Sequence, residues 1–99
     1  MQSLASILPG LMRELGLEER ATGWRAVSDW PALAGERIAR RTRATGFRDG
    51  ILSVEVEGSA WMHELGLLGP ELVRRVNEHL GAKVVREVRF TLARGGIQQ

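Results

Sequence analysis

The 99 residues of this chain are enough for one domain with one compact core. A hydrophobic content of 43% and a charged content of 26% are typical of a folded soluble protein, and a net charge of +2 excludes a polycation. The sequence has no cysteine, which excludes disulfides, thiolate metal sites and cysteine nucleophiles and fits a cytoplasmic protein. No apolar run approaches the roughly 18 residues that span a bilayer, and no secretory signal is evident.

The first expected element is an amphipathic helix. Its apolar residues recur with helical spacing at Leu4, Ile7, Leu8, Leu11, Met12 and Leu15. A cap at Ser6 would put Pro9 in the first turn, where its missing N–H costs little, whereas a cap at Ser3 would make Pro9 kink the helix. The stripe is either part of the core or an apolar surface for a partner, including a second copy of the chain.

A second helix is expected from Glu18 to Trp30, where Trp24, Val27 and Trp30 are three residues apart and Gly23 weakens the pattern. Pro31 argues against continuation past Trp30, so residues 31–39 are expected to form a separate short helical piece. Residues 41–48 predict a strand, which Gly46 loosens or bulges.

Asp49-Gly50 predicts a tight hairpin turn. The strand after it alternates Leu52, Val54 and Val56 on a buried face with Ser53, Glu55 and Glu57 on a wet one. Ser59 is the candidate N-cap of the next helix, whose apolar side carries Trp61, Leu65 and Leu68.

Gly69-Pro70 is expected to break that helix and start another, which Gly81 ends. The core face of this last helix is Leu72, Val73, Val76 and Leu80, and Glu71 is expected to pair with Arg75. The final strand is expected over residues 84–92, with Val88, Phe90 and Leu92 pointing inward.

The order of these elements predicts an α+β fold: N-terminal helices, a β-hairpin, two helices and a third strand. The long crossover before the third strand suits a parallel pairing, and hence a three-stranded mixed sheet with helices on one face. We expect a single domain over residues 4–94 and a disordered tail over 95–99. The bare sheet face would carry Ser53, Glu55, Glu57, Glu87, Arg89 and Thr91.

Several short motifs, in this order, resemble the DciA family of bacterial replicative-helicase loaders. One segment joins the end of the second helix to the first strand through Trp30, Gly35, Ile38, Ala39 and Thr42. Further matches are the Asp49-Gly50 turn, the helix start at Ser59, Trp61, Glu64 and Leu65, and the closing Val76-Asn77, Gly81 and Val88-Arg89-Phe90. The resemblance covers about residues 4 to 92.

The resemblance implies a KH-like domain that binds the hexameric helicase DnaB, promotes its loading on single-stranded DNA and has DNA affinity. Many members carry a long basic tail after the folded domain, whereas this sequence stops soon after the last expected strand. We therefore expect DNA binding to be weak and salt-dependent. A cytoplasmic, non-enzymatic replication factor is the leading interpretation. A general KH-like RNA or single-stranded-DNA module and a pure protein-interaction domain are the alternatives.

Candidate phosphate contacts are arginines, whose planar guanidinium binds phosphate oxygens in pairs. Five fall within twelve residues with no acid between them up to Arg48, and two more lie on the last strand region: Arg37, Arg40, Arg41, Arg43, Arg48, Arg86 and Arg89. The alternative is a solvated surface in which these arginines pair with nearby acids such as Glu36, Asp49, Glu55 and Glu57. The helicase contacts cannot be assigned to residues from the sequence.

The remaining motifs favour structural roles. Gly66-Leu67-Leu68-Gly69 matches the GxxG loop of KH domains, but it lacks the basic residue that holds phosphate and is expected to be a helix break with Leu68 in the core. The three tryptophans lie on apolar stripes and are expected to pack in the core, with Trp24 the most exposed. His63 and His79 lack metal-ligand spacing, no catalytic motif is present, and no cofactor is expected.

Overall fold

The computed structural model describes residues 3–95 of the chain, without the side chain of Met12. The described residues form, in chain order, α1 (Leu4–Glu14), α2 (Leu17–Ala34), α3 (Glu36–Ala39), β1 (Thr42–Arg48), β2 (Ile51–Val56), α4 (Ser59–Leu67), α5 (Gly69–Leu80) and β3 (Glu87–Leu92). This order confirms the α+β fold class. Residues 96–99 of the expected tail lie outside the described part of the chain.

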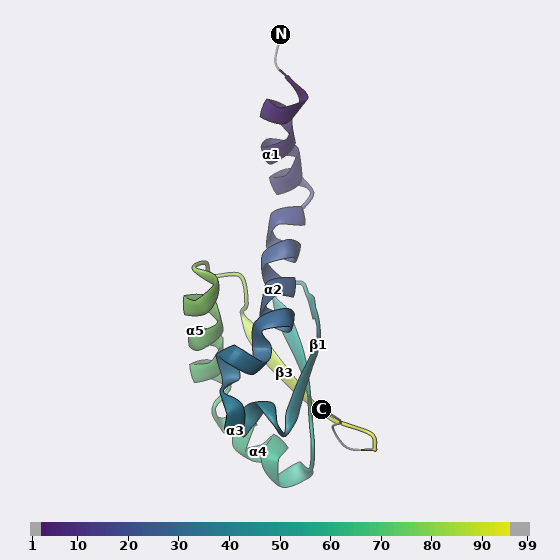
Figure 1. Ribbon diagram of the computed structural model, residues 1–99, viewed down its shortest axis with the longest axis vertical. Coiled ribbons are helices and arrows are strands. Elements are labelled where there is room, and N and C mark those ends of the chain that lie inside the picture. Colours follow the sequence, from purple (N-terminus) through teal and green to yellow (C-terminus); the bar gives the residue numbers. More distant parts are fainter. Residues whose placement is uncertain (1–2, 96–99) are drawn as a thin grey trace.

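The three strands form one mixed sheet in the order β1-β2-β3. β1 pairs antiparallel with β2, and β3 pairs parallel with β2, as the long connection through α4 and α5 predicted. The helices lie against the sheet, with α5 beside β3 and α2 beside β1 (Figure 1). The three-stranded mixed sheet with helices packed against it is the architecture that the sequence predicted.

The hairpin turn and the bulge are both where the sequence predicts them. Asp49 and Gly50 both have positive φ, 52° and 80°, which is the backbone of the two-residue turn that matches the twist of a hairpin. The pairing register shifts between Ala44 and Gly46, so one extra residue bulges from β1.

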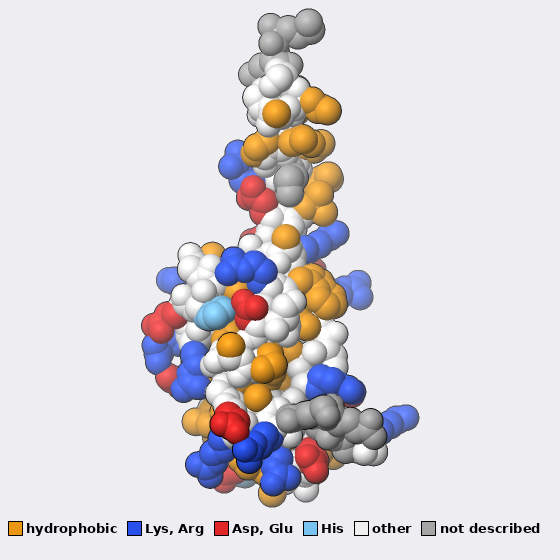
Figure 2. Space-filling model, viewed as in Figure 1, with side chains coloured by type: hydrophobic (Ala, Val, Ile, Leu, Met, Phe, Trp, Pro, Cys, Tyr) orange, Lys and Arg blue, Asp and Glu red, His pale blue; other side chains and the backbone are white. Residues whose placement is uncertain are grey.

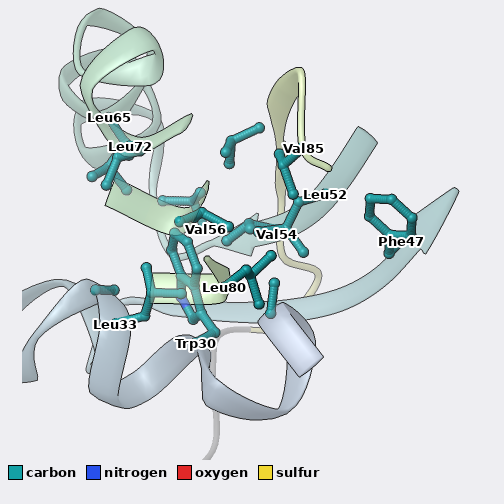
Figure 3. Close-up of a cluster of buried hydrophobic side chains, with 14 residues drawn as sticks. Trp30, Leu33, Phe47, Leu52, Val54, Val56, Leu65, Leu72, Leu80 and Val85 are labelled. Carbon is teal, nitrogen blue, oxygen red and sulfur yellow. The ribbon is translucent and has the colours of Figure 1, made fainter. Parts of the chain in front are cut away.

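The core lies between the sheet and the helices (Figure 3). Leu52, Val54 and Val56 of β2 are fully buried, which confirms the alternation read from the sequence. Leu72, Val76 and Leu80 of α5 and Leu65 of α4 face them. Burial of these aliphatic side chains is the main favourable term holding the helices to the sheet.

Trp30 anchors α2 to the start of β1. Its ring is almost fully buried, and its Nε1–H donates to Thr42 Oγ1 at 2.8 Å. The Thr42 hydroxyl in turn donates to the Ile38 carbonyl at 2.8 Å. Because a buried indole N–H needs an acceptor, this chain of two hydrogen bonds explains why a threonine occupies an otherwise apolar site.

Pro9 and Pro31 lie inside helices, and the prediction that the second helix ends before Pro31 is wrong. α2 continues through Pro31 to Ala34 and ends at Gly35, whose φ is 89°. Burial of Trp30, Leu33 and Ala34 on both sides of Pro31 outweighs the one helical hydrogen bond that proline removes. α1 begins at Leu4 with Ser3 in the N-cap position, so Pro9 falls in its interior rather than in its first turn.

Three side chains expected in the core are exposed: Trp24, Leu68 and Leu92 are 49%, 44% and 49% accessible. Leu68 directly follows α4 and Leu92 is the last residue of β3, whereas Trp24 lies within α2. The helix cap predicted at Ser59 is also wrong, since Gly58 occupies the N-cap position and no side chain caps α4.

The last strand is shorter than predicted and begins at Glu87 rather than at residue 84. The backbone N–H groups of Val84 and Val85 donate to Asn77 Oδ1 at 3.1 and 2.9 Å, and Asn77 Nδ2 donates to the Val85 carbonyl at 2.7 Å. One side chain of α5 thus satisfies backbone groups that a strand would have paired with a neighbour.

The ion pair predicted between Glu71 and Arg75 is replaced by a pair one residue earlier. Arg74 lies between Glu71 and Glu78 and bonds to both. Both i,i+3 and i,i+4 spacings bring side chains together on a helix, and Arg74 can use one of each.

The molecule is elongated, with principal extents of 59, 25 and 20 Å. α1 projects from one end of the body (Figure 1). Among the described elements it contacts only α2, its neighbour in sequence.

Candidate functional site

The seven candidate arginines occupy three places on the body. Arg37, Arg40 and Arg41 lie on and directly after α3. Arg43, Arg48 and Arg89 belong to strand positions that alternate with the buried ones, so they lie on the sheet face away from the helices. Arg86 lies against the hairpin turn, where its Nε donates to the Asp49 carbonyl at 3.0 Å. β1 separates the first group from Arg48 by about 20 Å, at roughly 3.3 Å per residue.

The α3 group surrounds the ring of Trp61, which projects from the first turn of α4. The guanidinium carbons of Arg37 and Arg41 lie 5.9 and 6.0 Å from the ring centroid. At this separation a cation is attracted to the negative face of an indole ring. Trp61 is half-buried, so the sequence prediction that it is a core anchor is only partly right.

Two pockets meet at this end of the molecule. One, of about 390 Å³, is lined by Glu36, Arg37, Arg40, Arg41 and Trp61. The other, of about 410 Å³, shares Arg37 and Trp61 and is lined on its apolar side by Ile38, Leu65 and Leu68. Cationic and aromatic groups therefore converge on one surface, which we call the α3 end.

Most of the candidate arginines have an acidic neighbour, as the alternative interpretation expected. Arg40 bonds to Glu36 at 2.6 Å, and Arg43 bonds to Glu55 across the β1–β2 ladder. Arg89 bonds to Glu87 at 2.9 Å. The pairs of Arg41 with Glu57 and of Arg48 with Asp49 are longer, each 3.7 Å. Exposed pairs of this kind contribute little to stability, so they can exchange for a phosphate at small cost.

Of the seven candidates, Arg37 and Arg86 form no ion pair among residues 3–95. Arg86 donates to the Asp49 carbonyl, whereas Arg37 lies over the Trp61 ring. Arg37 also lines both pockets of the α3 end. The sequence signal that could have marked this place is the pairing of an Arg-rich helix with a tryptophan at a helix start. Only the fold brings these two segments together.

The second candidate surface is the apolar stripe of α1, which the sequence left open between core and partner. Leu4, Ile7, Leu8, Leu11 and Leu15 are all exposed, with accessible fractions from 42% to 73%. Hydrophobic side chains follow one side of the projecting helix and continue onto the upper part of the body (Figure 2). The stripe is therefore not part of the intramolecular core.

Among the described residues, no helix has the length and apolar character needed to cross a membrane. No group of three or more His, Cys, Asp or Glu side chains is placed to hold a metal ion in that part of the chain.

A small α+β domain with arginines around an aromatic ring and an uncovered apolar helix has the features of a binding module. Comparison with known families agrees. The chain matches the family model described as "Dna[CI] antecedent, DciA" over residues 3–90, so it belongs to the DciA family. At the level of the family this supports a helicase-loader type of role in DNA replication.

Several curated bacterial proteins are similar to the chain. The UPF0232 proteins of Mycolicibacterium paratuberculosis and Mycobacterium tuberculosis are each 30% identical to it over 90 residues, which is 91% of this chain and 50% and 48% of theirs. The UPF0232 protein of Streptomyces avermitilis is 33% identical over 86 residues, 85% of this chain and 48% of its own. The chain thus spans about half the length of the relatives it matches.

Proposed function

We propose that this protein is a non-enzymatic replication factor of the cytoplasm that binds the replicative helicase DnaB and assists its loading on single-stranded DNA. The observation that carries the proposal is the family match, which extends over residues 3–90 and so includes every element from α1 into β3. The two candidate surfaces suit the two ligands, since the arginines suit phosphate and the apolar helix suits a protein.

Binding to the helicase is tested by titrating the full chain into the cognate DnaB hexamer in a calorimeter. We expect saturable binding at micromolar concentrations or tighter. The rate at which DnaB loads on single-stranded DNA should then be higher with the protein present than without it. No heat and no co-elution with DnaB at micromolar concentrations would rule out the proposal.

For DNA, we propose that contact is made first at the α3 end, with Arg43, Arg48, Arg86 and Arg89 extending the positive surface along the sheet. Arg37 has no ion pair to exchange among the described residues, and Arg41 has only a long one. Both guanidinium groups lie about 6 Å from the centroid of the Trp61 ring, and an aromatic ring of this kind can stack on a base. Net charge is only +2, so affinity should be modest and steeply dependent on salt.

Replacing Arg37 and Arg41 together by Ala tests this surface. We expect weaker binding to an oligothymidine strand and a smaller salt slope, because each lost phosphate contact reduces the slope by about 0.7 on a single strand. Fluorescence anisotropy between about 50 and 200 mM salt measures both quantities.

The matched control replaces Arg43 and Arg89 by Ala, since both are paired with acids on the sheet face. The control should change affinity and slope less than the α3-end variant does. If the two double variants weaken DNA binding equally, the DNA contacts the whole positive surface. If the salt slope is unchanged when Arg37 and Arg41 are replaced, the α3 end does not contact DNA.

A further inference from the structure

The apolar face of α1 is exposed along the length of the helix. α1 contacts only α2 among the described elements, and α2 is its own continuation in sequence. Five exposed aliphatic residues follow its length: Leu4, Ile7, Leu8, Leu11 and Leu15. A contiguous exposed apolar face of this kind is typical of a protein interaction site.

The width of the face indicates the shape of its occupant. At 100° per residue, the directions of these five residues fall within an arc of about 100°. Ile7 marks one edge of the arc and Leu8 the other. A single neighbouring helix covers only a narrow seam, whereas an arc of this width is what a helix buries when it packs against two neighbours. The fitting occupant is therefore an apolar groove between two helices.

The length and composition of α1 also indicate that it needs packing against a partner to be a stable helix. α1 has 11 residues and contains Pro9 and Gly10. Helices shorter than about 12 residues are marginal in water, and both of these residues lower helix stability further. Burial of the apolar face against a partner is the usual source of the missing stability.

A second copy of the chain fits the face less well. Two α1 helices would meet along about 16 Å, the length of 11 residues. Such a contact involves only a few side chains on each side, well below the roughly 20 to 30 residues of a standard interface. The other copy also offers a convex helix rather than a groove.

A larger partner can use more of the surface. Leu17 and Trp24 of α2 are exposed next along the chain, at 38% and 49%. Hydrophobic side chains continue along the same side from α1 to the body of the molecule (Figure 2). Trp is the residue type most enriched among interface hot spots. Residues 3–12 include no charged side chain, so a partner groove needs no complementary charges there.

We infer that α1, extended by Leu17 and Trp24, is the helicase-docking element of this protein and inserts into an apolar groove formed by two helices of the partner. The inference rests on the proposed function, since it takes the partner to be the replicative helicase. It separates the two activities in space: the apolar arm holds the protein partner, and the α3 end at the opposite end of the body stays free for DNA.

The test is binding of the double variant Leu8→Gln/Leu11→Gln to DnaB, measured by calorimetry on the full chain. Both side chains are exposed and Gln favours helix, so the body should fold as before, which near-ultraviolet circular dichroism checks. We expect at least tenfold weaker binding. Leu4→Gln, at the most exposed position of the stripe, provides a second variant and should weaken binding several-fold.

The matched control is Ala5→Gln/Arg13→Gln, which alters the same helix outside the apolar arc and should change affinity less than twofold. Sedimentation of the protein alone is measured in parallel, and the wild type should be a monomer. If the Leu variants bind DnaB like the wild type, the inference is overturned and the proposed function stands. If the wild type is instead a dimer, and the Leu variants lose the dimer but keep DnaB binding, a second copy of the chain covers the apolar face of α1. If the wild type itself does not bind DnaB, both fail.

Discussion

At the scale of single residues, Gly23 shows how a poor helix former can be required by packing. It lies in the middle of α2 and is buried, and a Cβ built on it would overlap the ring of Phe47 in β1. The helix can approach the strand closely only because no side chain is there. The sequence showed this glycine as a weakness of the helix, whereas its role is to seat an aromatic ring.

Replacing Gly23 by Ala is therefore expected to destabilise the protein by about 1–3 kcal/mol, as overpacking of a core does, despite the better helix propensity of Ala. Urea unfolding followed by tryptophan fluorescence measures the change. The control is Gly66→Ala in α4, where no atom lies within 4 Å of the added Cβ, and it should stabilise by up to about 1 kcal/mol. Equal responses at the two sites would show that the Phe47 ring can move aside.

At the scale of elements, α5 shows a buried face and a charged face that act separately. Leu72, Val76 and Leu80 hold it to the sheet, and Arg74 joins Glu71 and Glu78 on the exposed side. The hydrogen bond from Arg74 lowers the pKa of Glu71 below its ordinary value of 4.5. Desolvation opposes this shift, and the charges of Arg74 and Arg75 add to it.

The direction of that shift predicts a pH dependence. A carboxyl with a lowered pKa in the folded state contributes stability above its unfolded pKa, and this contribution is lost as the pH falls through the folded value. Arg74→Gln should raise the pKa of Glu71 toward 4.5, as an NMR titration of its side chain would show. The stability difference between the variant and the wild type should shrink below about pH 4, and it should be small throughout because the group is exposed.

Arg75→Gln is the matched control for this change, since Arg75 acts on Glu71 only through charge and contributes least to the shift of its pKa. It should move the pKa of Glu71 less than Arg74→Gln does. If the two variants shift it equally, general charge and not the hydrogen bond sets the pKa.

At the scale of the whole molecule, the protein divides into a packed body and an arm. The buried core begins in sequence at Ala26 and lies entirely between α2, the sheet, α4 and α5. α1 adds length to the molecule without adding to this core. The arm and the body should therefore respond independently to change.

A chain that begins at Leu15 tests this division. We expect its body to unfold cooperatively with a free energy within about 1 kcal/mol of the full chain, since surface changes away from packed contacts have small effects. Thermal and urea unfolding measure this. The same truncation should remove binding to DnaB and leave DNA affinity nearly unchanged. A loss of several kcal/mol would mean that α1 stabilises the body.

Much of the fold followed from local patterns. The alternation in residues 51–56 predicted the central strand, Asp49-Gly50 predicted the turn, and Gly81 predicted the end of α5, because each depends on the residue's own backbone preferences or periodicity. The continuation of α2 through Pro31 could not be predicted in this way. It depends on the burial of Trp30, Leu33 and Ala34, and the sheet that buries them is formed by other parts of the chain.

The sequence by itself determined the element order, the sheet type and the family, because these are recorded in periodicity, turn residues and short motifs. Only the tertiary structure decided which apolar faces are covered. The stripes of α1 and α5 follow the same helical rule, but a sheet lies beneath α5, whereas no part of the chain within residues 3–95 covers the stripe of α1. Burial depends on what another segment places opposite a side chain, and the same dependence brought Arg37 and Arg41 to Trp61 and divided seven arginines among three places.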